Sequence, residues 1–100
     1  MEIKYTVGEG KKAVEKSIEI IKPDDLGWAE YCKTMDIEIK LANPNGSQFT
    51  DVANIVQIYT AKSNIEMRDW SKKCETKADF IGEIGAVFSE ILKEIESKKK

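Results

Sequence analysis

The sequence predicts an α+β protein in which an N-terminal β-hairpin is followed by about four α-helices, the last one the longest. Near the N-terminus, apolar and polar residues alternate, which is the pattern of a half-buried strand. Further along, apolar residues recur every three or four positions in several separate runs, which is the pattern of helices with one buried face. The length of 100 residues fits a single domain, residues 1–100, with one core.

The hairpin is expected at the start of the chain. Every second residue is apolar over Glu2–Val7, a turn rich in glycine and lysine follows at residues 8–12, and alternation resumes over 14–20. A short helix is the alternative for the second segment, because some of its apolar residues are also spaced by four and three. Its β-branched residues and Pro23 favour the strand.

A first helix is expected to begin near Pro23–Asp25, with Asp24 as its N-cap. Its apolar residues step by four, three, four and three, and they are Trp28, Cys32, Met35, Ile39 and Ala42. Because Ile37–Leu41 also alternates with charged residues, a strand is the alternative for the last third of this segment, and helix is preferred. Asn43–Ser47 combines proline, glycine and two asparagines and is expected to be a connecting loop.

Two shorter helices are expected after this loop. The first runs from Phe49 to about Ala61, with Thr50 as its cap. The second opens with Ser63–Glu66, a capping box in which the serine and glutamate side chains satisfy each other's backbone amides, and it continues through Trp70.

The longest helix is expected over Thr76–Lys100. Thr76 can accept a hydrogen bond from a first-turn amide, Asp79 puts negative charge at the positive end of the helix dipole, and three lysines follow at the negative end. The apolar residues form one face, which must be buried, and they are Phe80, Ile81, Ile84, Val87, Phe88, Ile91, Leu92 and Ile95.

A narrow row of small residues, Gly82, Gly85 and Ser89, lies beside this apolar face. Glycine inside a helix costs about 1 kcal/mol relative to alanine, so two glycines in one turn require a reason. We expect another helix of the domain to approach closely there, and approach by a partner is the alternative.

No residue pattern points to catalysis. The chain has no histidine, and Cys32 and Cys74 fit no zinc spacing, so both are expected to be buried thiols that form no disulfide. Acidic pairs at Asp24–Asp25 and at Asp36 with Glu38 have the chemistry to bind a divalent cation, but capping explains the first pair better. We therefore expect no enzyme, no cofactor and no metal.

The charge pattern and hydropathy exclude two further classes. Sixteen Lys and Arg residues and eighteen Asp and Glu residues give a net charge of -2, and both signs are interleaved except at the C-terminal lysines. A nucleic-acid-binding protein would concentrate basic residues on one face. No stretch approaches the ~20 apolar residues of a membrane span, and no leader segment is recognised. A cytoplasmic protein that works by contact with other proteins is expected.

The order of these elements carries a resemblance. It comprises an extended segment ending in Ile20–Asp25, a helix with Trp28 and Tyr31, the run Phe49–Thr60, the capping box leading to Trp70, and the amphipathic segment Phe80–Leu92. In this layout the chain resembles the short tail assembly chaperones of long-tailed bacteriophages. The resemblance implies a non-enzymatic homo-oligomer of the host cytoplasm that keeps the tape measure protein soluble and helps tail tube subunits assemble around it.

The lysine end fits the same resemblance. Many such chaperones are also made in a longer form by ribosomal frameshifting, and slippery sites are often adenine runs, which encode lysine. Lys98–Lys100 is what such a run would leave in the protein. The alternative is a solvated basic end that complements the helix dipole.

The partner surface is expected on the apolar face of the last helix, where a helical segment of the tape measure protein would bind. The residues inferred from apolarity are Phe80, Ile84, Val87, Phe88 and Ile91. An alternative from another class is a small phage or bacterial protein that inhibits a host defence nuclease or regulator by masking its surface.

Overall fold

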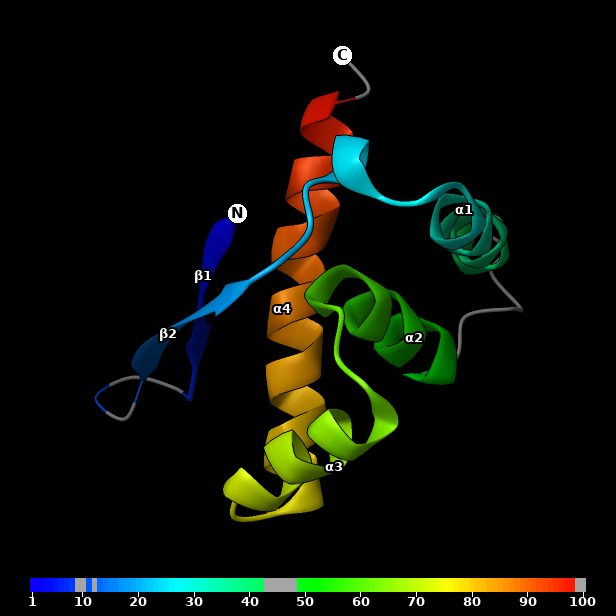
Figure 1. Cartoon of the computed structure of the whole chain (residues 1–100). Helices are drawn as coiled ribbons and strands as arrows, with labels where there is room; N and C mark the ends of the chain where they lie inside the picture. Colours follow the sequence, from blue (N-terminus) through cyan, green and yellow to red (C-terminus); the bar gives the residue numbers. More distant parts are fainter. Residues whose placement is uncertain (9–10, 12, 43–48, 99–100) are drawn as a thin grey trace.

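The computed structural model describes residues 1–8, 11, 13–42 and 49–98, with residues 40–42 and 98 described by their backbone alone. Over these residues it has the predicted α+β architecture, an antiparallel hairpin followed by four α-helices of which the last is the longest (Figure 1). The elements are β1 (Glu2–Val7), β2 (Val14–Glu19), the 3-10 helix η2 (Pro23–Asp25), α1 (Trp28–Ala42), α2 (Phe49–Thr60), α3 (Asn64–Lys73) and α4 (Lys77–Lys98). The helix alternative for β2 and the strand alternative for the end of α1 are wrong.

Some predicted features lie outside the described residues. They are most of the turn at residues 8–12, the connecting loop Asn43–Ser47, and the end of the lysine run at Lys99 and Lys100. The side chain of Ala42 is likewise not described.

The hairpin buries one strand more deeply than the other. Ile3 and Tyr5 of β1 are each 6% exposed, whereas Val14 of β2 is 53% exposed. In the antiparallel register Tyr5 lies opposite Lys16, so both side chains are on the same face of the hairpin. Gly8, the residue after β1, has a φ of 88°, a conformation that glycine adopts at little cost.

The centre of the fold is α4, which lies between the hairpin and α2 (Figure 1). Its side chains Ile84, Val87 and Ile91 are 0% exposed, and Ile95 is 7% exposed. They pack in one core with the buried residues of β1 and α2, which include Ile3, Tyr5, Ile55, Val56 and Tyr59. The predicted burial of the α4 face is confirmed for these positions, while Ile81 at its edge is 49% exposed.

Two predicted helix starts are confirmed by their hydrogen bonds. Ser63 Oγ accepts from Glu66 N at 3.1 Å, and a Glu66 carboxylate oxygen accepts from Ser63 N at 3.2 Å, which completes the capping box of α3. Thr76 Oγ1 caps α4 by accepting from Asp79 N at 3.1 Å. Thr50, expected as a cap, instead lies in the first turn of α2, which begins one residue earlier.

The start of α1 differs from the prediction. Pro23–Asp25 forms the separate 3-10 turn η2, so Asp24 lies within that turn instead of capping the longer helix. The backbone is extended at Leu26, with φ −63° and ψ 139°, and α1 begins at Trp28. The fixed φ of proline suits the start of either kind of helix, which is why the sequence signal did not separate the two.

The close approach expected at Gly82 and Gly85 is not found among the described residues. A Cβ atom built on either glycine would meet nothing within 4 Å. Intramolecular packing therefore does not require their small size, and this corrects the expectation.

We expect Gly82→Ala and Gly85→Ala each to raise the free energy of unfolding by about 0.5–1 kcal/mol, because alanine favours the helix and enters open space there. Urea unfolding followed by circular dichroism measures the change. Gly8→Ala is the contrasting control and should be destabilising, since its φ of 88° strains alanine. A loss of stability in both α4 variants would contradict the open surroundings of these glycines.

Candidate functional site

Most of the partner surface expected on α4 lies inside the protein. Ile84, Val87 and Ile91 are 0% exposed, and Phe80 and Phe88 are partly buried against the same core. A side chain without exposed area cannot contact another protein in this conformation. The expectation is therefore corrected for the three buried residues, whose apolarity serves the core between the hairpin and α2.

A row of apolar side chains on α1 is exposed instead. Trp28 and Ile39 are 78% and 67% exposed, Tyr31 and Met35 are 43% and 36% exposed, and Cys32 is also exposed. Because these positions are three or four residues apart, they lie on one side of the helix. We call these five residues the α1 stripe.

The sequence predicted a helix from the spacing of this row, without Tyr31, and the structure shows that the row is on the exposed side of that helix. The side of α1 that is buried carries Thr34, 2% exposed, and Ile37, 9% exposed. Thr34 Oγ1 donates to the Tyr31 carbonyl at 2.8 Å, so the buried hydroxyl has a partner. In Figure 1, α1 lies beside α2 and apart from α4. Cys32 is exposed, so the expected burial of this residue is wrong.

Trp28 and Tyr31 stack on each other at the N-terminal end of the α1 stripe. Their ring centroids are 5.9 Å apart and their planes are inclined by 20°. Stacking fixes the orientation of the two rings, while both remain exposed. Aromatic side chains are enriched where proteins contact one another, so this end of the stripe is well suited to anchor a partner.

A groove of about 910 Å³ lies between α1 and α2, beside the α1 stripe. Its apolar lining includes Leu26, Ile37 and Ile58, and its charged lining comprises Glu30, Lys33, Asp36, Asp51 and Lys62. Carboxylates outnumber lysines in this lining. The stripe is therefore bordered on one side by a concave surface with an excess of acidic groups.

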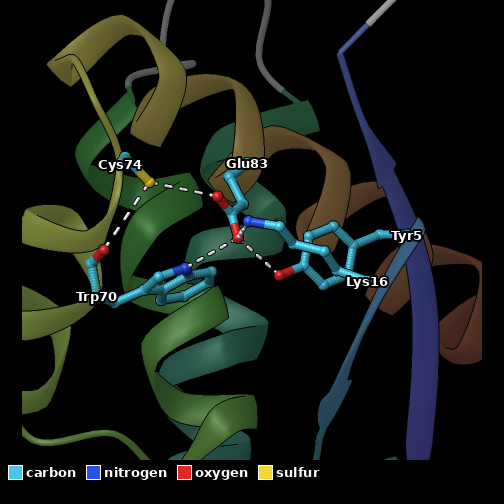
Figure 2. A network of polar contacts seen from close by, with 5 residues as sticks. All are labelled: Tyr5, Lys16, Trp70, Cys74 and Glu83. Carbon is cyan, nitrogen blue, oxygen red and sulfur yellow. Dashed lines mark hydrogen bonds and ion pairs between the residues drawn. The ribbon is translucent and has the colours of Figure 1, made fainter. Parts of the chain in front are cut away.

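A separate polar cluster joins the hairpin, α3 and α4 around Glu83, which is 5% exposed (Figure 2). Glu83 Oε1 accepts hydrogen bonds from the Tyr5 hydroxyl at 2.8 Å and from Trp70 Nε1 at 3.1 Å. Lys16 Nζ forms an ion pair with the same oxygen at 3.4 Å, and the Cys74 thiol donates to Oε2 at 3.3 Å. We call these five residues the Glu83 cluster.

The pKa values in the Glu83 cluster follow from burial and from these contacts. Burial by itself would raise the pKa of Glu83, but hydrogen bonds from Tyr5, Trp70 and Cys74, with the charge of Lys16, outweigh it and lower that pKa. Burial, followed by the hydrogen bond to Glu83, raises the pKa of both Tyr5 and Cys74. At neutral pH the carboxyl group is therefore ionised and the phenol and thiol are protonated.

These protonation states favour a structural role for the Glu83 cluster. A catalytic nucleophile or acid needs a pKa moved toward the working pH, whereas here the pKa values of Glu83, Tyr5 and Cys74 are moved away from it. The thiolate is the reactive form of cysteine, and burial disfavours it at Cys74. The cluster fastens the hairpin and α3 to α4 through one shared acceptor.

We expect acid to weaken the fold through Glu83. Its pKa in the folded protein lies below the usual 4.5, so the carboxylate contributes stability above about pH 4.5 that is lost as the pH falls through the folded-state pKa. Urea unfolding at about pH 7 and about pH 3 measures this loss. Glu83→Gln should be less stable at neutral pH and should lose less stability on acidification. An equal pH dependence in both proteins would contradict this role.

Sequence reasoning identified neither the Glu83 cluster nor the place of Tyr31 in the α1 stripe. One signal was available for Glu83, which stands three residues after Phe80 and four before Val87, where the helical row is otherwise apolar. For Tyr31 the signal was its position three residues after Trp28.

Neither a group of metal ligands nor a membrane-spanning helix is found within the part of the chain that the structure describes. No three or more His, Cys, Asp or Glu side chains are grouped there in a way that would hold a metal ion. None of the described helices has both the length and the apolarity to cross a membrane.

Comparisons of the chain with protein-family models, with curated proteins and with solved structures gave no match.

Proposed function

We propose that this chain is a non-enzymatic binding protein that holds an apolar helical segment of another protein against the α1 stripe. The observation that carries the proposal is the exposure of five aligned side chains, two of them stacked aromatics, on a helix packed against α2. Contiguous exposed apolar side chains of this kind mark contact surfaces. A helix laid along the stripe would bury side chains from both helices at successive turns.

The layout of the chain supports a particular form of this function, that of a phage tail assembly chaperone. The bound segment then belongs to the tape measure protein, binding takes place in the host cytoplasm, and tail tube subunits join during assembly of the tail. Exposed apolar segments of a long protein aggregate, so a small protein that covers them keeps that protein soluble. Self-association, which the resemblance also implies, would use a surface other than the α1 stripe.

The size of the α1 stripe fits a specific but reversible contact. Complete burial of one large apolar side chain contributes about 1.5–3 kcal/mol. Part of this gain is offset by lost motion of the partners and by ordering of side chains. A few such side chains therefore suit a complex that forms during assembly and is released when the tail is complete.

Co-purification with the tape measure protein tests the proposal. We expect Ile39→Asp to reduce the co-purifying amount at least about ten-fold, because a carboxylate would enter an apolar contact. Ile81→Asp is the matched control, since Ile81 is an exposed isoleucine on α4, outside the stripe. If Ile39→Asp has an unchanged circular dichroism spectrum and the tape measure protein still co-purifies at the wild-type level, the α1 stripe is not the contact surface.

A further inference from the structure

We infer that the occupant of the α1 stripe is an α-helix with apolar residues in a heptad pattern and basic residues on both sides of them. The two helices would lie side by side as in a two-stranded coiled coil. The inference rests on the proposed function, because it specifies the chemistry of the segment that the stripe binds.

The spacing of the α1 stripe is that of a coiled-coil seam. Trp28, Cys32, Met35 and Ile39 follow one another by four, three and four residues, which places them alternately at the d and a positions of a heptad. Tyr31 occupies the neighbouring g position. A helix that packs on a broad core carries a wider apolar face, whereas this row is narrow and exposed. A partner helix with the same repeat would keep contact along the whole row.

Two of the four positions that flank this seam are acidic, and the other two are Ala29 and Tyr31. In the same heptad Asp36 is at e and Glu38 is at g, the first exposed and the second half-buried. The groove on the side of Asp36 is lined by more carboxylates than lysines. Charges at e and g positions select the partner of a helix, so Lys or Arg at the facing positions is favoured.

A second copy of α1 fits this seam poorly. In an antiparallel pair that aligns the two stripes, Asp36 would face Ala29 and Glu38 would face Tyr31, and neither of these supplies positive charge. In a parallel pair, Asp36 would face Tyr31, which supplies no positive charge. In neither arrangement does the second copy bring a basic side chain to Asp36 or Glu38. The charge pattern therefore favours a different chain with basic flanks.

Two synthetic helical peptides of about four heptads test the inference. Both carry leucine at a and d, and one carries lysine at e and g where the other carries glutamate, so that like charges discourage each peptide from pairing with itself. Titration is followed by the fluorescence of the exposed Trp28 at low and high salt. We expect the basic peptide to bind at least about ten-fold more tightly, with a smaller difference at high salt.

Matched variants separate local charge from net charge. Asp36→Lys should reduce the preference for the basic peptide, whereas Asp69→Lys, the same change at an exposed position of α3, should leave it unchanged. If both peptides bind equally tightly and Ile39→Asp abolishes their binding, the inferred basic flanks of the bound helix are wrong and the proposed function is retained. Binding of neither peptide, while the tape measure protein still co-purifies through the stripe, would overturn the heptad occupant alone. If neither peptide binds and the tape measure protein does not co-purify through the stripe, the proposed function is overturned as well.

Discussion

Replacing Ile84 by aspartate is expected to abolish the cooperatively folded state. Ile84 has no exposed area and lies in the core that α4 shares with β1 and α2. A carboxylate there would lose its hydration without gaining a partner, and the packing of the isoleucine would be lost as well. Because a domain of this size is stable by only about 5–15 kcal/mol, such a change should leave the variant largely unfolded.

Ile81→Asp provides the matched control, because Ile81 is 49% exposed and lies three residues earlier in the same helix. We expect it to lower the free energy of unfolding by less than about 1 kcal/mol. Far-UV circular dichroism and urea unfolding of the two variants measure the contrast. Two equally well folded variants would contradict the buried position of Ile84 and would make the α4 face available to a partner again.

Glu83→Leu should have the second largest effect, a loss of about 3–5 kcal/mol, which corresponds to a fall in Tm of more than about 10 °C. Leucine has a similar volume but accepts no hydrogen bond. The Tyr5 hydroxyl and Trp70 Nε1 would lose their acceptor, and Lys16 would lose its ion pair. Each buried donor left without an acceptor costs about 1–3 kcal/mol, so the losses accumulate at one place.

Two further variants make the Glu83 result specific. Glu90→Leu removes a carboxylate of the same helix that pairs with Lys93 at 3.0 Å on the surface, and we expect a change of at most about 0.5 kcal/mol. Adding Tyr5→Phe to Glu83→Leu should recover part of the loss, because the hydroxyl without an acceptor is then absent. Wild-type stability of Glu83→Leu would mean that the cluster does not hold these elements together. Thermal unfolding of all four proteins provides the comparison.

The elements that have local signals could be predicted from the sequence. The alternation of Glu2–Val7, the capping box at Ser63 and the cap at Thr76 each depend on residues a few positions apart, and the structure confirms all three. The burial of the α4 face was predictable as well, because removing a long apolar row of side chains from water stabilises the folded protein.

The orientation of α1 could not be predicted from spacing. Periodicity shows that Trp28, Met35 and Ile39 share one side of the helix, but it does not show whether that side meets the core. Exposed apolar residues are common on protein surfaces, so apolarity alone does not decide burial. Which side of α1 faces the core depends on how Thr34 and Ile37 pack in the folded chain, and no local sequence pattern encodes that packing.

The Glu83 cluster was hidden from the sequence for a different reason. Tyr5 and Lys16 lie 78 and 67 residues from Glu83, and only the docking of the hairpin on α4 brings them together. A buried carboxylate is rare without partners, but its partners cannot be recognised until the topology is known.

Alkylation of Cys32, with and without bound tape measure protein, tests most directly whether the α1 stripe binds the partner. Cys32 is exposed within the stripe, whereas Cys74 is half-buried and has a pKa raised by burial and by Glu83, so Cys74 should react slowly in both states. Mass spectrometry of the two cysteine peptides separates their rates. We expect Cys32 to be alkylated rapidly in the free protein and slowly in the complex. Equal rates at Cys32 in the free protein and in a complex shown to be intact would contradict binding at the α1 stripe.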